Sequence, residues 1–266
     1  MLRSLSLLLV LAFAGKPVDP ARAAAAKAEL EEKGYALDPE RFAGRVRNGD
    51  LATVRLYLDA GMDPNVGDRG TPPLQEAATR GHLDVLFALL DAGADPNKKD
   101  DNGSTPLQEA VVQRQAAAVK VLMDRGANPN LIYKNGGDTP LIRASGVGST
   151  ETFRVLLDGG ADPNRLDDNG AGPLMAEAQK GNAENVKLLL AKGADPNARA
   201  AGGGTPLTMA VVLDKVEVAR LLLQAGADTK KDRAMLTSSA RSPEMKKLLA
   251  NPPAVKKPAK TGGKKK

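Results

Sequence analysis

A five-residue motif recurs along this chain at a nearly constant spacing. Gly-Ala-Asp-Pro-Asn occurs three times, and its close variants occur three times more. The third residue of each copy stands at positions 63, 95, 128, 162, 195 and 228, so the steps are 32, 33, 34, 33 and 33 residues. A regular step of this size indicates stacked supersecondary units that each contact their neighbours, in place of one globular core.

The segment 100–130 shows how one unit is built. A turn at 101–103 precedes a first helix in which Pro106 takes the first helical position, where a missing N–H costs nothing. Thr105 is placed to cap this helix, and Gln108 stands three residues later, as a capping box requires. A second helix with apolar residues at helical spacing follows, and Gly126 suits the left-handed conformation that ends a helix.

The same scheme organises most of the chain. A proline opens each first helix: Pro73, Pro106, Pro140, Pro173 and Pro206. The second helices end in apolar runs, and in one of them we expect Leu188 to be buried. We expect a helical lead-in at 24–37, exposed to solvent, then repeats over 38–250 with a degenerate last helix pair, and a disordered tail at 251–266.

The first 23 residues have the features of a signal peptide. Arg3 supplies a positive charge, residues 5–13 form a short apolar run, and small residues flank two cleavage sites, after Ala14 and after Ala23. The second site is favoured, because residues 15–20 look like the extended segment before cleavage. No other run of about 18 apolar residues follows, so we expect no transmembrane segment in the mature chain. The sequence thus predicts an exported protein, periplasmic or alternatively secreted.

The formal charge of +6 belongs to the ends of the chain. Residues 251–266 contain six lysines and no acid, and residues 1–23 carry a net +2, which leaves −2 on the remainder. We therefore expect no nucleic-acid binding through the repeat body. The tail could contact anionic lipid, nucleic acid or cell-wall polymer, or simply remain solvated.

These motifs resemble the ankyrin repeat. The family's Gly-x-Thr-Pro-Leu opening matches residues 103–107, 137–141 and, more loosely, 203–207; its Gly-His turn matches Gly81-His82; and its Gly-Ala-Asp-x-Asn closing is the recurring motif. The resemblance implies an all-α ankyrin-repeat solenoid of stacked helix-turn-helix units with β-hairpin-like finger turns. The unusually Gly-rich turn at 200–204 departs from the pattern and is expected to be the softest of these fingers.

The residues offer little for catalysis or metal binding. The chain has no cysteine and one histidine, His82, whose family position braces a turn. The recurring aspartates, such as Asp95 and Asp195, fit backbone turns better than a ladder of calcium ligands, and the glycines at 202–204 lack the rest of a phosphate-binding motif. We expect no catalytic residue, no metal and no cofactor.

The repeat frame implies which residues face a ligand in this family, namely the finger tips and the ends of the first helices. The finger candidates are Arg69, Asn102, Asn135, Asp168 and Asn169, with Ile132 and Tyr133 in an apolar hairpin. The helix candidates are Thr79, Arg80, Val112, Gln113, Val147, Gln179, Lys180, Val212 and Leu213. The valines and Leu213 would form a contiguous exposed apolar strip, which marks interaction surfaces. The other interpretation is that these side chains pack on neighbouring repeats.

The resemblance implies a non-catalytic, monomeric adaptor that binds a protein partner. With an export signal, the chain is similar to exported bacterial ankyrin proteins, some of which are linked to oxidative-stress defence or to neutralising a toxin. A periplasmic, stress-protective binder is the favoured prediction. An effector or immunity-type protein that binds a toxin or a host protein is the alternative.

Overall fold

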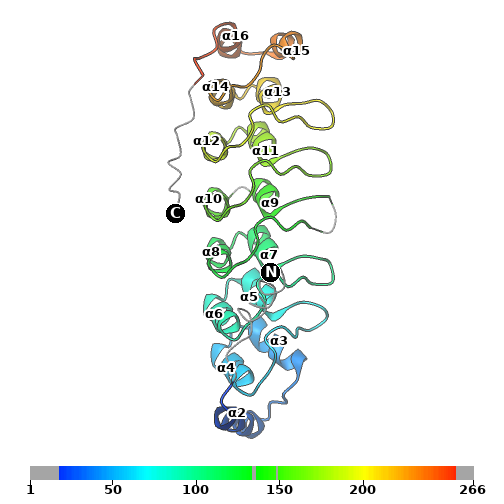
Figure 1. Ribbon diagram of the computed structural model, residues 1–266, viewed down its shortest axis with the longest axis vertical. Helices are drawn as coiled ribbons and strands as arrows, with labels where there is room; N and C mark the ends of the chain where they lie inside the picture. Colours follow the sequence, from blue (N-terminus) through cyan, green and yellow to red (C-terminus); the bar gives the residue numbers. More distant parts are fainter. Residues whose placement is uncertain (1–17, 134–135, 148, 256–266) are drawn as a thin grey trace, which may run out of the picture. The chain divides into compact units, whose positions relative to one another are not determined.

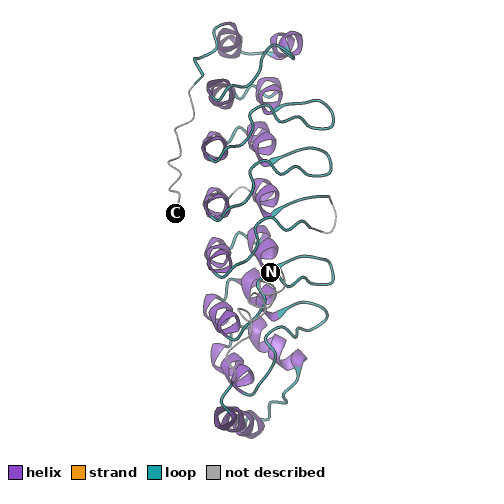
Figure 2. Cartoon of the chain, viewed as in Figure 1, coloured by secondary structure: helices purple, strands orange, loops and turns teal. Residues whose placement is uncertain are grey.

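The computed structural model describes residues 18–133, 136–147 and 149–255, and the chain divides into two compact units, 1–134 and 135–266. Within the described residues, all regular structure is helical, and a single isolated bridge joins Asp68 and Thr71 (Figures 1 and 2). The helices come in antiparallel pairs joined by short turns, and longer finger loops connect one pair to the next.

The first unit holds seven helices within its described residues. They are α2 (Pro20–Glu32), α3 (Pro39–Arg47), α4 (Leu51–Asp59), α5 (Pro73–Arg80), α6 (Leu83–Asp91), α7 (Pro106–Val112) and α8 (Ala116–Asp124). First helices stack on first helices, as α3 and α7 do on α5, and second helices stack on second helices, as α4 and α8 do on α6.

Helix α2 is the expected helical lead-in and is mostly exposed, but two of its side chains are buried, which the sequence did not predict. It begins at Pro20 and packs against α4, where Ala26 and Leu30 are buried. Arg22 also reaches Asp59 of α4, with 2.9 Å between Nη2 and Oδ2. The helix covers the end of the stack, because the outer face of a terminal repeat would otherwise leave apolar side chains in water.

The second unit holds eight helices within its described residues. They are α9 (Pro140–Val147), α10 (Thr150–Asp158), α11 (Pro173–Lys180), α12 (Ala183–Ala191), α13 (Pro206–Val212), α14 (Val216–Gln224), α15 (Arg233–Ser239) and α16 (Pro243–Ala250). The short last pair stacks on the pair before it, α15 on α13 and α16 on α14.

The helix starts follow the predicted chemistry. Thr105 and Thr205 each form a complete capping box, the first with Gln108 and the second with Thr208. Prolines occupy the first position of these helices, and Gly81 caps α5 in the left-handed conformation with φ 72°. These signals act within one helical turn, so they specify the helix ends without any contact between repeats.

The core is a row of small and branched apolar side chains between the two helix layers. Leu89, Leu122, Leu156, Leu189 and Leu222 hold equivalent places in successive second helices, and each has 0% of its surface exposed. The prediction that Leu188 is buried is wrong, since Leu188 is half-buried and Leu189 fills the core. In an apolar run of three leucines, the run alone does not identify the residue that faces inward.

The asparagine of each Asp-Pro-Asn motif links its repeat to the next one. In the first unit, Asn97 Oδ1 accepts the backbone N–H of Asn128 at 2.7 Å, and its Nδ2 donates to the Gly126 carbonyl at 3.1 Å. In the second unit, Asn197 makes the same pair of bonds to Asp228 and Gly226, at 2.7 and 3.2 Å. Because the bonds cross between repeats, the motif sets the stacking register as well as the turn.

Candidate partner-binding surface

The finger loops are held at their bases by hydrogen bonds within each loop. The N–H of Asp100 donates to the Ser104 carbonyl at 2.9 Å, and the Asp100 carboxylate accepts the Ser104 N–H at 2.8 Å. Asp167 and Ala171 repeat this arrangement in the second unit, at 2.9 and 2.8 Å. These aspartates therefore act in the backbone turn, and the loops present their tips on a fixed base.

The Gly-rich finger is braced in a different way. Arg199 Nη1 donates to the Gly203 carbonyl at 2.8 Å, and its Nη2 lies 2.7 Å from Asp232 Oδ2. Arg199 thus ties this loop to the start of α15. The expectation that this would be the softest finger did not take this arginine into account.

Neighbouring fingers of the second unit are joined through their backbones. The N–H of Asp168 donates to the Gly136 carbonyl at 3.2 Å, and the N–H of Ala201 donates to the Asn169 carbonyl at 3.0 Å. The backbones of these two candidate residues are thus engaged between loops, whereas their side chains are exposed. A rigid edge with free polar side chains suits recognition of a partner.

Burial raises the pKa of Asp138, which lies at the base of the same edge. Arg143 opposes the rise, with its Nε 2.9 Å from Asp138 Oδ2, and the carboxylates of Asp167 and Asp168 add to it. The ion pair with Arg143 therefore offsets part of the repulsion between Asp138 and these two carboxylates.

The first-helix ends of the second unit do not form the contiguous apolar strip that the sequence predicted. Val212 and Leu213 are 38% and 43% exposed, but Val147 is half-buried. Helix α11 lies between their two helices and presents Gln179 and Lys180, both exposed. The exposed apolar area is therefore a two-residue patch with polar neighbours, because the repeats differ in sequence at these positions.

The candidates of the first unit are mostly polar. Thr79 donates from its hydroxyl to the Gln75 carbonyl at 2.7 Å, and Arg80 Nε lies 3.4 Å from Glu76 Oε2. Among the remaining candidates, three are exposed, namely Arg69, Asn102 and Gln113. Three are half-buried, namely Val112, Ile132 and Tyr133. Asn135 lies outside the described residues.

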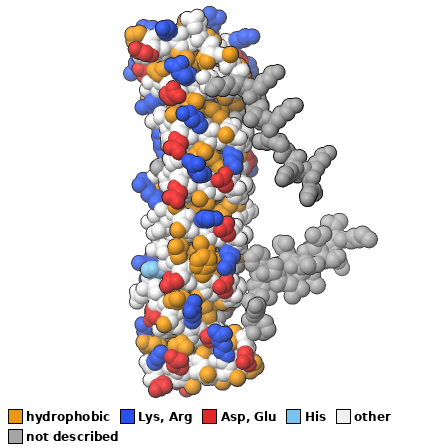
Figure 3. Space-filling model, turned by 90° about the vertical axis from the view of Figure 1, so that its left-hand side faces the viewer, with side chains coloured by type: hydrophobic (Ala, Val, Ile, Leu, Met, Phe, Trp, Pro, Cys, Tyr) orange, Lys and Arg blue, Asp and Glu red, His pale blue; other side chains and the backbone are white. Residues whose placement is uncertain are grey.

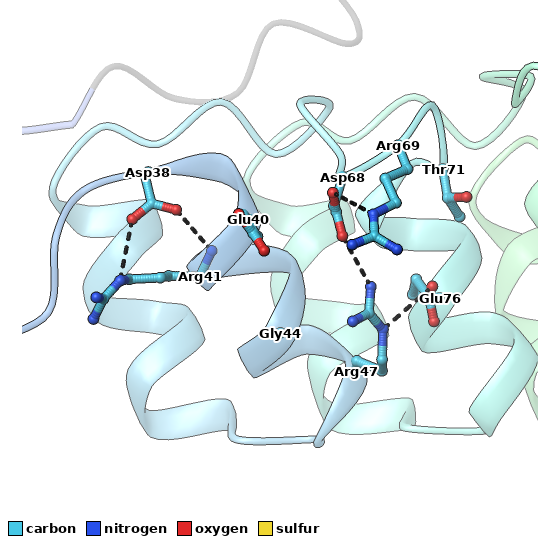
Figure 4. Close-up of a pocket in the computed structure, with 9 residues that line it drawn as sticks. All are labelled: Asp38, Glu40, Arg41, Gly44, Arg47, Asp68, Arg69, Thr71 and Glu76. Atoms are coloured by element: carbon cyan, nitrogen blue, oxygen red, sulfur yellow. Dashed lines mark hydrogen bonds and ion pairs between the residues drawn. The ribbon is translucent and has the colours of Figure 1, made fainter.

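A polar pocket of about 740 Å³ lies beside Arg69 in the first unit (Figure 4). Arg47, at the end of α3, reaches Asp68 Oδ2 at 3.4 Å and Glu76 Oε1 at 3.5 Å. Arg69 stands on the facing loop with a positive φ of 50°, and 86% of its side chain is exposed. Glu40 lines the same pocket, so a partner would meet both signs of charge here.

Arg47 is the residue of this surface that the sequence analysis missed. The first repeat lacks the Pro-Leu opening that the other five units share. Its Gly49 lies 32 residues before Gly81, and both adopt the left-handed conformation. Alignment on these turns, in place of the openings, gives Arg47 the position of Thr79 and would have found it.

His82 has the bracing role predicted for it. Its Nε2 lies 3.2 Å from the Arg47 carbonyl, and its ring packs so closely on Gly49 that a Cβ there would approach Nδ1 to 2.9 Å. Gln115 takes the equivalent place one repeat later, with its Nε2 3.4 Å from the Thr79 carbonyl. Within the described ranges, no three histidine, aspartate or glutamate side chains are grouped to hold a metal ion.

Similarity to known proteins identifies the family of this chain. Residues 43–133, 84–167 and 141–233 match the family model for ankyrin repeats (3 copies), so the chain belongs to the ankyrin-repeat family. A protein of Treponema pallidum (strain Nichols) named for its ankyrin repeats is 35% identical over 78 residues, which are 29% of this chain and 26% of that protein. The match thus spans about a quarter of that relative.

A solved structure confirms the all-α ankyrin solenoid. The ankyrin repeat domain of Bcl-3, a member of the IκB family, matches with a TM-score of 0.72 and 26% identity, over 80% of this chain and 98% of that one. Ankyrin repeats are protein–protein interaction modules, and this chain carries such a module. No helix in the described part of the chain is both long and apolar enough to cross a membrane.

Proposed function

We propose that this protein is an exported adaptor that binds a protein partner in the periplasm through its finger tips and first-helix ends. The observation that carries the proposal is the exposed pair Val212 and Leu213, 38% and 43% exposed at the end of α13. Ligand contact explains their exposure, because the equivalent residues Gln179 and Lys180 in the repeat before are polar.

Two further features support the proposal. The fingers of the same unit are joined by backbone bonds, at Asp168 and at Asn169, so a partner would pay little entropy to order them. The signal-like residues 1–23 support the periplasm as the site of action. A stress-protective role is the finer part of the proposal and follows from the resemblance to exported bacterial ankyrin proteins.

Photo-crosslinking in intact cells tests the surface. A photoreactive phenylalanine analogue is placed at Leu213 and, as the matched control, at Met235, which is 38% exposed on α15 of the same unit. The proposal expects a periplasmic protein crosslinked from position 213 and not from position 235. Val212→Asp should abolish the crosslink while leaving the thermal midpoint within a few degrees, because the side chain is at the surface.

Two results would contradict the proposal. One is a crosslinked protein from position 235 alone, which would move the interface to the last helix pair. The other is a large fall in the thermal midpoint of Val212→Asp, which would show that Val212 packs in the core.

A further inference from the structure

The last helix pair has a different charge pattern from the repeats it covers. Residues 229–255 contain the cations Lys230, Lys231, Arg233, Arg241, Lys246 and Lys247 and only two acids, Asp232 and Glu244. Asp232 is already paired with Arg199, outside this segment. None of the six cations pairs with a carboxylate of the described residues, although Arg143, Arg154, Lys192 and Arg220 of the same unit do so.

The cations gather at an open end of the second unit. Helices α15 and α16 use one face to pack on α13 and α14, and among the described elements no further helix pair covers their other face. Lys and Arg side chains are prominent over this end, at the top of Figure 3. Unpaired like charges at one end of a unit generate a positive potential that attracts anions.

Between the two helices lies a groove of about 460 Å³ with both apolar and basic walls. Leu236, Leu249 and Pro252 supply the apolar part, and Arg233 on α15 and Lys246 on α16 supply one cation from each side. Met235 on α15 and Val255 after α16 expose 38% and 63% of their surfaces. The outer face of a terminal repeat is normally polar, so this combination is unusual.

We propose that this end of the protein docks on a membrane surface rich in anionic phospholipid. The lipid phosphates would lie against Arg233 and Lys246, and the adjoining acyl or glycerol carbons would cover the apolar part of the groove. A purely polar polyanion would leave that part in water, which is why the groove favours a lipid. The six lysines of residues 256–266 raise the net charge of residues 229–266 to +10, so the sequence extends the same attraction.

Vesicle sedimentation of the full chain tests the proposal. Vesicles of phosphatidylcholine alone are compared with vesicles of phosphatidylcholine and phosphatidylglycerol in equal parts. Binding is expected to the second kind only, and to weaken strongly in high salt because exposed charges are screened. Arg233→Glu/Lys246→Glu should weaken binding at least ~10-fold, since each basic residue near such a surface is worth roughly 5-fold.

The matched control is Arg165→Glu/Lys187→Glu, which makes the same charge change at two exposed residues of the repeats. It should bind within about twofold of the wild-type chain if the site is local. Both variants should keep the wild-type thermal midpoint, because all four side chains lie on the surface. An equal loss of vesicle binding in the two variants would overturn the proposal, because it would show that net charge and not the groove determines binding.

Other outcomes would also overturn the proposal. Removal of residues 256–266 should not abolish the preference for phosphatidylglycerol, because the groove remains; complete loss would assign binding to the tail alone. Equal affinity for phosphatidylcholine vesicles would exclude an anionic site. Tighter binding to inorganic polyphosphate than to vesicles would exclude the lipid as the ligand.

Discussion

Two neighbouring repeats of the second unit have the same frame and different cores. In the α11–α12 repeat, Glu177 and Asn185 are fully buried. In the α13–α14 repeat, the residues 33 positions later are Ala210 and Val218, which are equally buried. The comparison shows that caps, turns and the asparagine bonds determine the fold of a repeat. The core of one repeat can hold a carboxyl and an amide at positions where its neighbour has only hydrocarbon.

The polar pair is incompletely satisfied as it stands. Asn185 Nδ2 donates to Glu177 Oε2 at 2.9 Å, but Glu177 Oε1 and Asn185 Oδ1 have no hydrogen-bond partner. Lys180 Nζ lies 3.9 Å from Glu177 Oε1, an ion-pair distance. Burial raises the pKa of Glu177, and it outweighs the opposing effects of Asn185, Lys180, Asn182 and Ser145.

A proton on Glu177 would address both unsatisfied acceptors. The neutral carboxyl gains an O–H donor, and the Asn185 Oδ1 is an acceptor that needs one. Buried polar groups without partners cost free energy, so protonation removes a penalty that the charged form carries. We therefore expect a neutral acid paired with an amide in this core.

The largest expected effect is common to both repeats. Leu189→Ala and Leu222→Ala each delete a fully buried side chain and should each lower the free energy of unfolding by about 2–5 kcal/mol. Urea unfolding followed by circular dichroism measures both. A much smaller loss for Leu189→Ala would contradict the shared frame, because it would show that the polar repeat packs more loosely.

The polar pair itself should give the next largest effect. Asn185→Val leaves the Glu177 carboxyl buried without its donor and should lower the free energy of unfolding by about 1–3 kcal/mol. Glu177→Ala/Asn185→Val recreates the core of the α13–α14 repeat and should recover most of that loss. The double-mutant cycle isolates the interaction between the two side chains.

Additive changes in the free energy of unfolding in this cycle would contradict the pairing of Glu177 with Asn185. If the double variant were as unstable as the sum of its single changes, the two side chains would be independent. The acid–amide pairing would then be wrong, and each residue would simply fill space.

The pH dependence of stability distinguishes the two repeats further. The folded state holds a proton on Glu177 above the pH at which the unfolded chain releases it, because the folded pKa is raised. The stability linked to this group is therefore complete below the ordinary glutamate pKa and is lost as the pH rises through the folded value. As the pH rises above the ordinary glutamate pKa of about 4.3, Glu177→Gln should lose less stability than the wild-type chain.

The measurement is the urea midpoint of both proteins across this range. Glu184→Gln is the matched control, since Glu184 is an exposed glutamate on α12. Its pH profile should follow the wild-type profile. A Glu177→Gln profile parallel to the wild type would mean that Glu177 is ionised in the folded protein.

The sequence predicts the frame of this molecule well, because the frame depends on local chemistry. Thr105 with Gln108 and Pro106 at the helix start act within one turn, so a single sequence reveals them. Glu177 shows the limit: its placement two residues before Gln179 is plain, yet its burial and its pairing with Asn185 depend on a contact between two helices. The inward residue of a leucine run, Leu189 and not Leu188, is likewise decided by packing.

The candidate surface was predictable where repeats align and not where they diverge. Val212 and Leu213 are exposed as their place in the frame predicts. Arg47 was missed because its repeat opens differently, and the basic groove of α15 and α16 was missed because it arises between two helices. The groove depends on side chains that meet across two elements, which spacing along the chain does not show.

The smallest expected effect tests the bond that the two repeats share. Asn197 joins the α11–α12 repeat to the segment after α14 through two hydrogen bonds, at 2.7 and 3.2 Å. Because the side chain is exposed, water replaces part of what is lost, and Asn197→Ala should lower the free energy of unfolding by about 1 kcal/mol. Asn169→Ala, at an exposed finger tip, should change it by less than about 0.5 kcal/mol. Equal values in urea unfolding would mean that the asparagine bonds do not stabilise the stack, and the shared frame would then rest on the caps and the apolar core alone.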